Sequence, residues 1–213
     1  MPDTVVKICG LVTMDEVKAC LAYGADWLGF NCYPKSKRFI PPEKIRELVS
    51  IVPKNVLTVG VFVNESAGEV NRIMRHTGMN LVQLHGDETP EYTQMLIHKY
   101  FRAFRVSEQF QLDEISKYRG IYFLLDSYHA GHYGGTGASF NWEIAKRAKS
   151  FGQLILAGGL TPDNVGEAIK TVRPFGVDVC SGVELVPGVK DFKRIQAFIS
   201  AVKSADGKNK IDD

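Results

Sequence analysis

The stretch VVKICG (residues 5–10) contains the unit on which the fold prediction rests. Its apolar, β-branched residues predict a buried strand, and a glycine ends the run. Thr13 follows, with Glu16 three residues later, which is the capping-box pattern that starts a helix. The predicted unit is therefore a strand, a short loop and a helix, with the thiol of Cys9 where the strand gives way to the loop.

The same unit recurs along the chain. Seven further apolar runs predict strands at residues 27–31, 57–63, 81–85, 102–106, 121–126, 154–158 and 177–181. They are almost continuously hydrophobic, as expected for strands that are buried on both faces of a parallel sheet. Helix signals lie between them: Ser66 with Glu69, an N-cap at Thr161 before Pro162, and an apolar stripe within residues 192–202.

Eight strand–helix units predict an α/β fold, a single (βα)8 TIM barrel with parallel strands. No composition break marks a second domain, so we expect one domain over residues 1–213, with residues 204–213 a polar tail that frays. A doubly wound open sheet is the main alternative. It usually has fewer units, and no GxGxxG opens the first helix here.

Composition limits the class of protein. The 213 residues are 45% hydrophobic and 23% charged, with a net charge of +2, which gives no case for nucleic acid or an anionic membrane as partner. The start MPDTVVK predicts no signal peptide, and no apolar run approaches membrane-spanning length. Cys9, Cys20, Cys32 and Cys180 form no CxxC pair or zinc spacing. A cytoplasmic protein is expected.

Functional side chains of such a barrel lie at the C-terminal ends of the strands. AGGL places Gly158 and Gly159 after the seventh strand, and CSGVE places Ser181 and Gly182 after the eighth. Glycines let backbone N–H groups approach an anion closely. Either pair alone commonly forms only a turn. Their combination after these two strands favours a phosphate site.

Asp126 ends the apolar run of the sixth strand. A carboxyl group there is costly to desolvate unless it is paired or functional, and apolar surroundings favour the protonated form that a general acid needs. A helix N-cap or a salt-bridge partner is an equally good reading of this residue alone.

Cys9 also has two readings. A free cysteine is commonly a small buried hydrophobe, which is the reading we adopt for Cys20. At a strand end on the same face as Asp126, however, a thiol can act as a general base once its pKa is lowered. A thiol redox role is weaker, because no resolving cysteine lies near Cys9 in sequence.

Two loops complete the candidate site. In PKSKRFI (residues 34–40), Arg38 can grip a carboxylate or phosphate bidentately, whereas Lys35 and Lys37 read as solvated. The loop at residues 129–140 is rich in glycine and reads as a lid or ligand loop. Its two histidines, at positions 129 and 132, have no third ligand in view. No metal site and no cofactor motif are expected.

The motifs together resemble a known family. KICG, PKSKR, VQLHG, LLDS with GGTG and FNW, LAGGLTPxNV, and VDxxSGVE with PGxKD occur in order over residues 7–202. This set is similar to that of phosphoribosylanthranilate isomerases of tryptophan biosynthesis. The resemblance implies a (βα)8 barrel and a cofactor-free Amadori rearrangement. That reaction converts N-(5-phosphoribosyl)anthranilate to 1-(2-carboxyphenylamino)-1-deoxyribulose 5-phosphate.

The resemblance also implies roles for individual residues. Cys9 falls on the catalytic general base and Asp126 on the general acid. The remaining matches are Arg38 for the anthranilate group, Gly158, Gly159, Ser181 and Gly182 for the phosphate, and Gln83, His85 and Asp178 for other substrate contacts. Cys180 departs from the pattern, because the family usually has serine or a similarly small residue there. The departure bears on phosphate affinity rather than on reaction type.

Other functions remain open at this point. Another sugar-phosphate isomerase or epimerase, or a lyase similar to the tryptophan synthase α subunit, would share the phosphate site. An epimerase of this kind would be expected to show metal-binding His and Asp at strand ends, and a histidine-pathway barrel an aspartate in place of Cys9. A non-catalytic barrel that binds a phosphorylated ligand would need neither Cys9 nor Asp126. A small phosphosugar partner is expected, and both a monomer and a homodimer are open.

Overall fold

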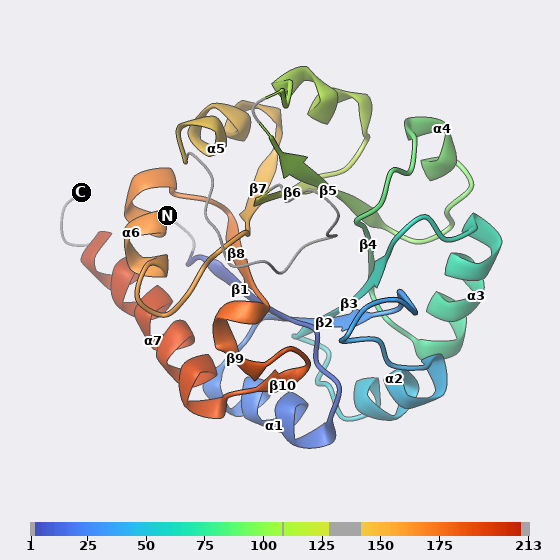
Figure 1. Ribbon diagram of the computed structural model, residues 1–213, viewed down its shortest axis with the longest axis horizontal. Helices are drawn as coiled ribbons and strands as arrows, with labels where there is room; N and C mark the ends of the chain where they lie inside the picture. The colour runs from blue at the N-terminus through green and yellow to red at the C-terminus, as the bar shows by residue number, and fades with distance from the viewer. Residues whose placement is uncertain (1–2, 108, 128–141, 210–213) are drawn as a thin grey trace.

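Eight parallel strands close into a barrel in the computed structural model, which describes residues 3–107, 109–127 and 142–209. The strands are β1 (Val5–Cys9), β2 (Trp27–Asn31), β3 (Leu57–Phe62), β4 (Leu81–Leu84), β5 (Tyr100–Val106), β6 (Tyr122–Ser127), β7 (Gln153–Leu156) and β8 (Gly176–Val179). Each pairs with the next, and β8 pairs with β1 (Figure 1). The predicted barrel is confirmed, with strand bounds shifted by at most two residues.

Helices surround the ring of strands (Figure 1). They are α1 (Met14–Tyr23), α2 (Pro42–Val49), α3 (Ala67–Thr77), α4 (Pro90–Thr93), α5 (Trp142–Ala148), α6 (Val165–Val172) and α7 (Phe192–Asn209), with 3-10 helices η1 (Leu112–Lys117), η2 (Lys149–Phe151) and η3 (Ser181–Val183). Helix α7 continues past residue 204, where the polar tail was expected, to Asn209. In the described part of the chain, no helix has the length and apolar character needed to span a bilayer.

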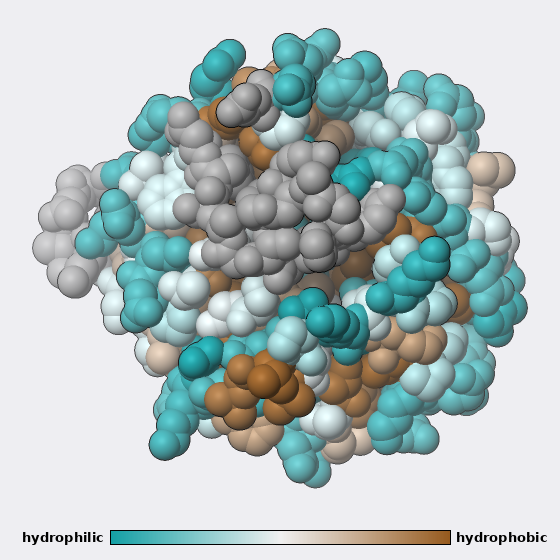
Figure 2. All heavy atoms as spheres, viewed as in Figure 1, coloured by the Kyte–Doolittle hydropathy of each residue, from teal (hydrophilic) through white to brown (hydrophobic). Residues whose placement is uncertain are grey.

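A small antiparallel hairpin that the sequence did not predict follows η3. It consists of β9 (Glu184–Val186) and β10 (Val189–Lys190). Its exposed Leu185, Val186 and Val189 form an apolar patch over these two strands (Figure 2). The strands are too short and too near the end of β8 to show a strand pattern of their own.

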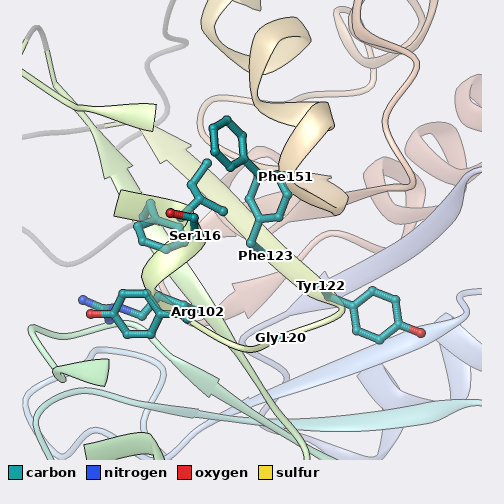
Figure 3. Close-up of a pocket in the computed structure, with 9 residues that line it drawn as sticks. Arg102, Ser116, Gly120, Tyr122, Phe123 and Phe151 are labelled. Atoms are coloured by element: carbon teal, nitrogen blue, oxygen red, sulfur yellow. The ribbon is translucent and has the colours of Figure 1, made fainter. Parts of the chain in front are cut away.

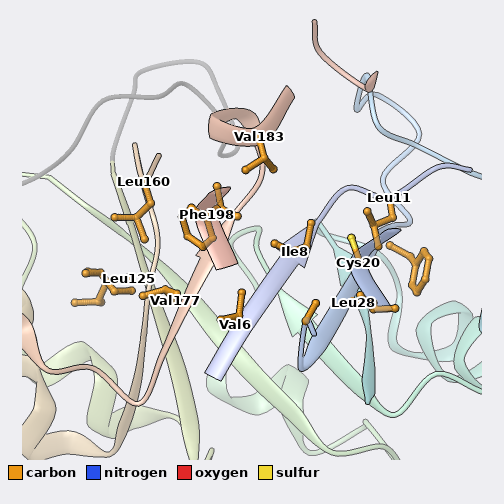
Figure 4. Packing of buried hydrophobic residues seen from close by; sticks show 14 of the residues in the cluster. Val6, Ile8, Leu11, Cys20, Leu28, Leu125, Leu160, Val177, Val183 and Phe198 are labelled. Atoms are coloured by element: carbon orange, nitrogen blue, oxygen red, sulfur yellow. The ribbon is translucent and has the colours of Figure 1, made fainter. Parts of the chain in front are cut away.

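Side chains alternate between the inside and the outside of the barrel wall, because successive residues of a strand face opposite sides. Val6, Ile8 and Leu28 point outward and join the layer that contains Cys20 of α1 and Phe198 of α7 (Figure 4). Both sides of the wall are therefore packed, which explains the continuous hydrophobicity of the strands.

Aromatic rings fill the N-terminal end of the barrel interior. The ring centroid of Trp27 lies 5.1 Å from that of Tyr122, and Tyr122 lies 5.1 Å from Phe175. Trp27 also stands 6.0 Å from Phe101, in a cluster with the buried Leu124. This end of the barrel is a packed core, which leaves the C-terminal end as the open mouth.

Of two helix-start predictions, one is confirmed and one is wrong. The capping box of α1 is confirmed: Thr13 Oγ1 accepts a hydrogen bond from the Glu16 N–H (3.2 Å), and Glu16 Oε2 accepts one from the Thr13 N–H (3.1 Å). The predicted N-cap at Thr161 is wrong, since α6 starts at Val165 after Asn164. The Asn164 side chain bonds the Thr161 N–H (2.8 Å) and the Gly159 carbonyl (2.9 Å), and so holds this segment as a loop.

Thr13→Ala removes a helix cap and should lower the free energy of unfolding by about 1 kcal/mol. Thr161→Ala is the matched control and should change it by less than about 0.5 kcal/mol, because no cap is lost. Urea unfolding followed by far-UV circular dichroism measures both. Equal losses in the two variants would contradict the assignment of the caps.

Candidate active site

The inward-facing side chains at the C-terminal end of the strands form the candidate site. Cys9 ends β1, His85 follows β4, Asp126 lies in β6 and Asp178 in β8, and all four are buried. In the closed barrel, β7 and β8 lie between β6 and β1. The glycine loops that follow β7 and β8 therefore lie between Asp126 and Cys9, as the strand-end argument requires.

A buried ion pair lies one inward position below Cys9. Lys7 is fully buried in β1, and its Nζ lies 2.9 Å from Asp178 Oδ1. Burial opposes the charge of Lys7, but the neighbouring carboxylate outweighs it, and the pKa of Lys7 is raised. Sequence reasoning missed Lys7, although a lone charge inside the apolar run VVKIC was a usable signal.

Cys9 and Cys180 are direct neighbours across the β1–β8 pairing. Ile8 pairs with Val179; Cys9, the last residue of β1, follows Ile8, and Cys180 directly follows the end of β8. Interaction with the Cys180 side chain, together with burial, raises the pKa of Cys9. The expected lowered pKa is found instead at Cys180, where the interaction with Cys9 and the charge of Lys190 bring the pKa to about 7.

Charged groups around the two thiols contribute to the difference in pKa between Cys9 and Cys180. Lys190 Nζ lies 3.7 Å from Cys180 Sγ and 3.0 Å from Glu184 Oε1. Glu184 is shared, because Arg38 also pairs with it, whereas Lys7 has its own carboxylate. Three cations (Lys7, Arg38, Lys190) thus face two carboxylates (Asp178, Glu184). The charges of Lys190 and Arg38 contribute to the lowered pKa of Cys180.

Arg38 lies at the mouth, as predicted, and holds a protein carboxylate there. Its Nε donates to Glu184 Oε1 (2.8 Å) and its Nη2 to Glu184 Oε2 (2.7 Å). This bidentate pair fixes the plane of the guanidinium group. Within the described residues, Nη1 has no hydrogen-bond partner and remains available to a ligand. Sequence reasoning missed Glu184 and Lys190, which lie in the unpredicted hairpin.

Gln83 and His85 form a chain that leads to Asp126. Gln83 Nε2 lies 2.9 Å from His85 Nδ1, and His85 Nε2 lies 3.4 Å from Asp126 Oδ2. With the amide donating to Nδ1, the imidazole proton is on Nε2, the nitrogen that faces Asp126. Gln83 Oε1 is buried and has no hydrogen-bond partner among the described residues, and His85 Nε2 has only the long contact with Asp126. A polar ligand or a water at the mouth could satisfy both atoms.

The two glycine loops are in contact with each other. A Cβ atom on Gly182 would lie 1.9 Å from the carbonyl oxygen of Leu160, so only glycine fits at this position. Ser181 starts η3 on the β8 side, and Gly158 and Gly159 follow β7. The predicted phosphate residues are therefore brought together at one side of the mouth.

Other candidate features lie elsewhere. A cavity of about 270 Å³ lies on the outer wall of the barrel, and Phe123 of β6, Ser116 of η1 and Phe151 of η2 are among the residues that line it (Figure 3). It contains neither Cys9 nor Asp126. The loop at residues 129–140, with its two histidines, lies outside the described residues. Among the described residues, no three His, Cys, Asp or Glu side chains are grouped closely enough to hold a metal ion.

Comparisons with known proteins agree with these observations. A family model described as N-(5'-phosphoribosyl)anthranilate (PRA) isomerase matches residues 6–201. The N-(5'-phosphoribosyl)anthranilate isomerase of Trichlorobacter lovleyi is 48% identical over 201 residues, which cover 94% of this chain and 98% of that protein.

Two solved structures are similar over the same extent, 94% of this chain and 99% of theirs. One is phosphoribosylanthranilate isomerase in complex with reduced 1-(o-carboxyphenylamino)-1-deoxyribulose 5-phosphate, at 37% identity and a TM-score of 0.85. The other contains monomers generated from the dimeric phosphoribosylanthranilate isomerase of Thermotoga maritima, at 37% identity and a TM-score of 0.84.

Lys7→Met should lower the free energy of unfolding by about 3–5 kcal/mol, because it leaves Asp178 buried without its cation. Lys7→Met combined with Asp178→Leu should be less destabilised than Lys7→Met alone. Lys44→Met, at the exposed Lys44–Glu47 pair, is the control and should change stability little. Urea unfolding of the four proteins tests this, and a double variant as unstable as Lys7→Met would contradict it.

Proposed function

This chain belongs to the N-(5'-phosphoribosyl)anthranilate isomerase family, and we propose that Cys9 and Asp126 are the general base and the general acid of its reaction. The protein is an isomerase of tryptophan biosynthesis. It rearranges N-(5-phosphoribosyl)anthranilate to 1-(2-carboxyphenylamino)-1-deoxyribulose 5-phosphate, an aldose-to-ketose conversion. The observation that carries the proposal is the position of Cys9 and Asp126, buried at strand ends on either side of the two glycine loops.

Asp126 opens the sugar ring. In its protonated form it donates its proton to the furanose ring oxygen while the bond between that oxygen and ribose carbon one breaks. The nitrogen lone pair forms the second bond to carbon one, which gives a Schiff base. His85, 3.4 Å from Asp126, orients the carboxyl group for this transfer.

Cys9 completes the rearrangement. Its thiolate takes the proton from ribose carbon two, and the electrons of that C–H bond form the carbon one–carbon two double bond of an enolamine. The enolamine then tautomerises to the ketone. Cys9 becomes the thiolate when its own proton moves to the neighbouring thiolate of Cys180. The cations around the pair favour the negative charge on either sulfur.

The ends of the substrate are held by separate groups. We assign the phosphate to the backbone of Gly158, Gly159, Ser181 and Gly182, which the contact between Gly182 and Leu160 supports. Arg38 binds the anthranilate carboxylate through its Nη1 side, since Glu184 occupies the other side. Gln83, His85 and Asp178 contact the polar groups of the sugar. Fixing both ends supplies the orientation that the proton transfers need.

The assembly and location of the enzyme are a further part of the proposal. A homodimer is supported by a relative described as dimeric, and sedimentation at micromolar concentration tests it. A cytoplasmic location is supported by four cysteines that are all free thiols in the described structure. Fractionation of the source cells tests the location.

Cys9→Ala and Asp126→Asn should each lower kcat by about a hundredfold or more, because each removes one proton-transfer group. The assay follows the loss of anthranilate-type fluorescence from freshly made phosphoribosylanthranilate. Inorganic phosphate binding, measured by calorimetry, should be retained in both variants and serves as the control for the fold. Near-normal turnover in either variant would overturn the role of that residue. No turnover in wild type and variants alike would contradict the assigned reaction and would favour a barrel that only binds its ligand.

The rate should also depend on pH through the thiol pair. The lowered pKa of Cys180, about 7, means that the pair lacks its one negative charge below this pH and gains it above. The value of kcat/KM should therefore rise through about pH 7. In Cys180→Ser this rise should move to higher pH, because Cys9 must then lose its proton without a second thiol to share the charge. An unchanged profile in Cys180→Ser would contradict proton sharing.

A further inference from the structure

We infer that Cys9 and Cys180 form a peroxide-sensitive pair, which oxidation converts to a disulfide that stops the reaction. The pair gives this isomerase a redox-modification site in addition to its catalytic one. Disulfide formation follows from the position of the two thiols alone. Its effect on the rate rests on the proposed role of Cys9 as the base.

The strand register places the two cysteines next to each other. They occupy matching positions that follow the Ile8–Val179 pair of β1 and β8. Neighbouring strands are about 4.8 Å apart, which lies inside the range of about 4.4–6.8 Å that disulfides span between Cα atoms. A bridge therefore needs no large movement of the barrel.

Close packing holds both sulfur atoms near this junction. A Cβ atom on Gly10, the residue after Cys9, would lie 3.0 Å from Cys180 Sγ. One on Gly29 of β2 would lie 2.8 Å from Cys9 Sγ. The two glycines thus leave room for the thiols and restrict where they can go.

Reactivity differs between this pair and the other two cysteines. Cys180 is partly exposed at the mouth, and Lys190 Nζ, 3.7 Å away, stabilises its thiolate. Burial instead raises the pKa of Cys20 and of Cys32 to about 12, so both stay protonated. The thiolate is the form that peroxides oxidise. Cys180 is therefore the site of first attack.

The oxidation balances in two steps. The Cys180 thiolate, with a proton from solvent, attacks hydrogen peroxide, so that the O–O bond breaks, a sulfenic acid forms and one water leaves. The Cys9 sulfur then attacks the Cys180 sulfur, and the second water leaves as the S–S bond forms. In total, two thiols and one peroxide give one disulfide and two waters. A dithiol reductant reverses the change.

Oxidation should leave the fold and the glycine loops intact while it removes the base. The disulfide also removes the one negative charge of the pair, so the three cations around it face only two carboxylates. The oxidised enzyme should therefore bind inorganic phosphate at least as tightly as the reduced enzyme. Loss of turnover without loss of phosphate binding distinguishes oxidation of the pair from unfolding.

The test treats the wild type, Cys180→Ser and Cys20→Ala with hydrogen peroxide and removes the excess with catalase. Mass spectrometry of tryptic digests then follows a cross-link between peptide 8–18, which contains Cys9, and peptide 171–190, which contains Cys180. Turnover, as a fraction of each protein's own starting value, and phosphate binding are measured on the same samples before and after dithiothreitol.

In the wild type and in Cys20→Ala we expect the cross-link to appear as turnover falls, by about a hundredfold at completion, with full recovery in dithiothreitol. Cys180→Ser should form no cross-link and show no fall that dithiothreitol reverses. Absence of the cross-link from oxidised wild type would overturn the inference. A complete cross-link with turnover retained would confirm the disulfide. It would contradict the claim that the disulfide stops the reaction, and with it the role of Cys9 as base.

Discussion

The pairing of β8 with β1 is the contact on which the rest of the molecule depends. It closes the barrel, and its register brings Lys7 beside Asp178 and Cys9 beside Cys180. Since side chains alternate along a strand, a shift of one residue in this register would move both pairs apart and turn polar groups into the apolar outer layer. The requirement to bury the outer layer therefore also positions the thiols.

Charge at the mouth is the second organising factor. The cations at Lys7, Arg38 and Lys190 are each within hydrogen-bonding reach of a carboxylate, yet one positive charge remains in excess. This excess allows a thiolate to exist in a largely buried site, where an isolated anion would be costly. The same charge favours an anionic substrate and makes the thiols reactive towards oxidants. The proposed catalytic role and the proposed sensitivity to oxidants thus have one electrostatic cause.

The barrel and most of its mouth could be predicted from sequence, because they follow from short-range patterns. Apolar runs indicated the strands, and Cys9 and Asp126 were chosen as candidates because they lie at the ends of these runs. What was missed depends on contacts between distant segments. The proximity of Cys9 and Cys180 comes from strand register, 171 residues apart in the chain. The predicted N-cap at Thr161 was wrong because the Asn164 side chain hydrogen-bonds the Thr161 N–H and the Gly159 carbonyl. Glu184 and Lys190 lie in a hairpin too short to show a periodicity.

The aromatic cluster at the N-terminal end of the barrel limits where substrate and product can enter and leave. Trp27, Tyr122 and Phe175 close that end, so the described part of the barrel offers no through-passage. Substrate and product, which carry the same phosphate and carboxyphenyl ends, must exchange through a single opening. Each product molecule has to vacate the site before the next substrate can enter. Accumulated product therefore competes with substrate for the site.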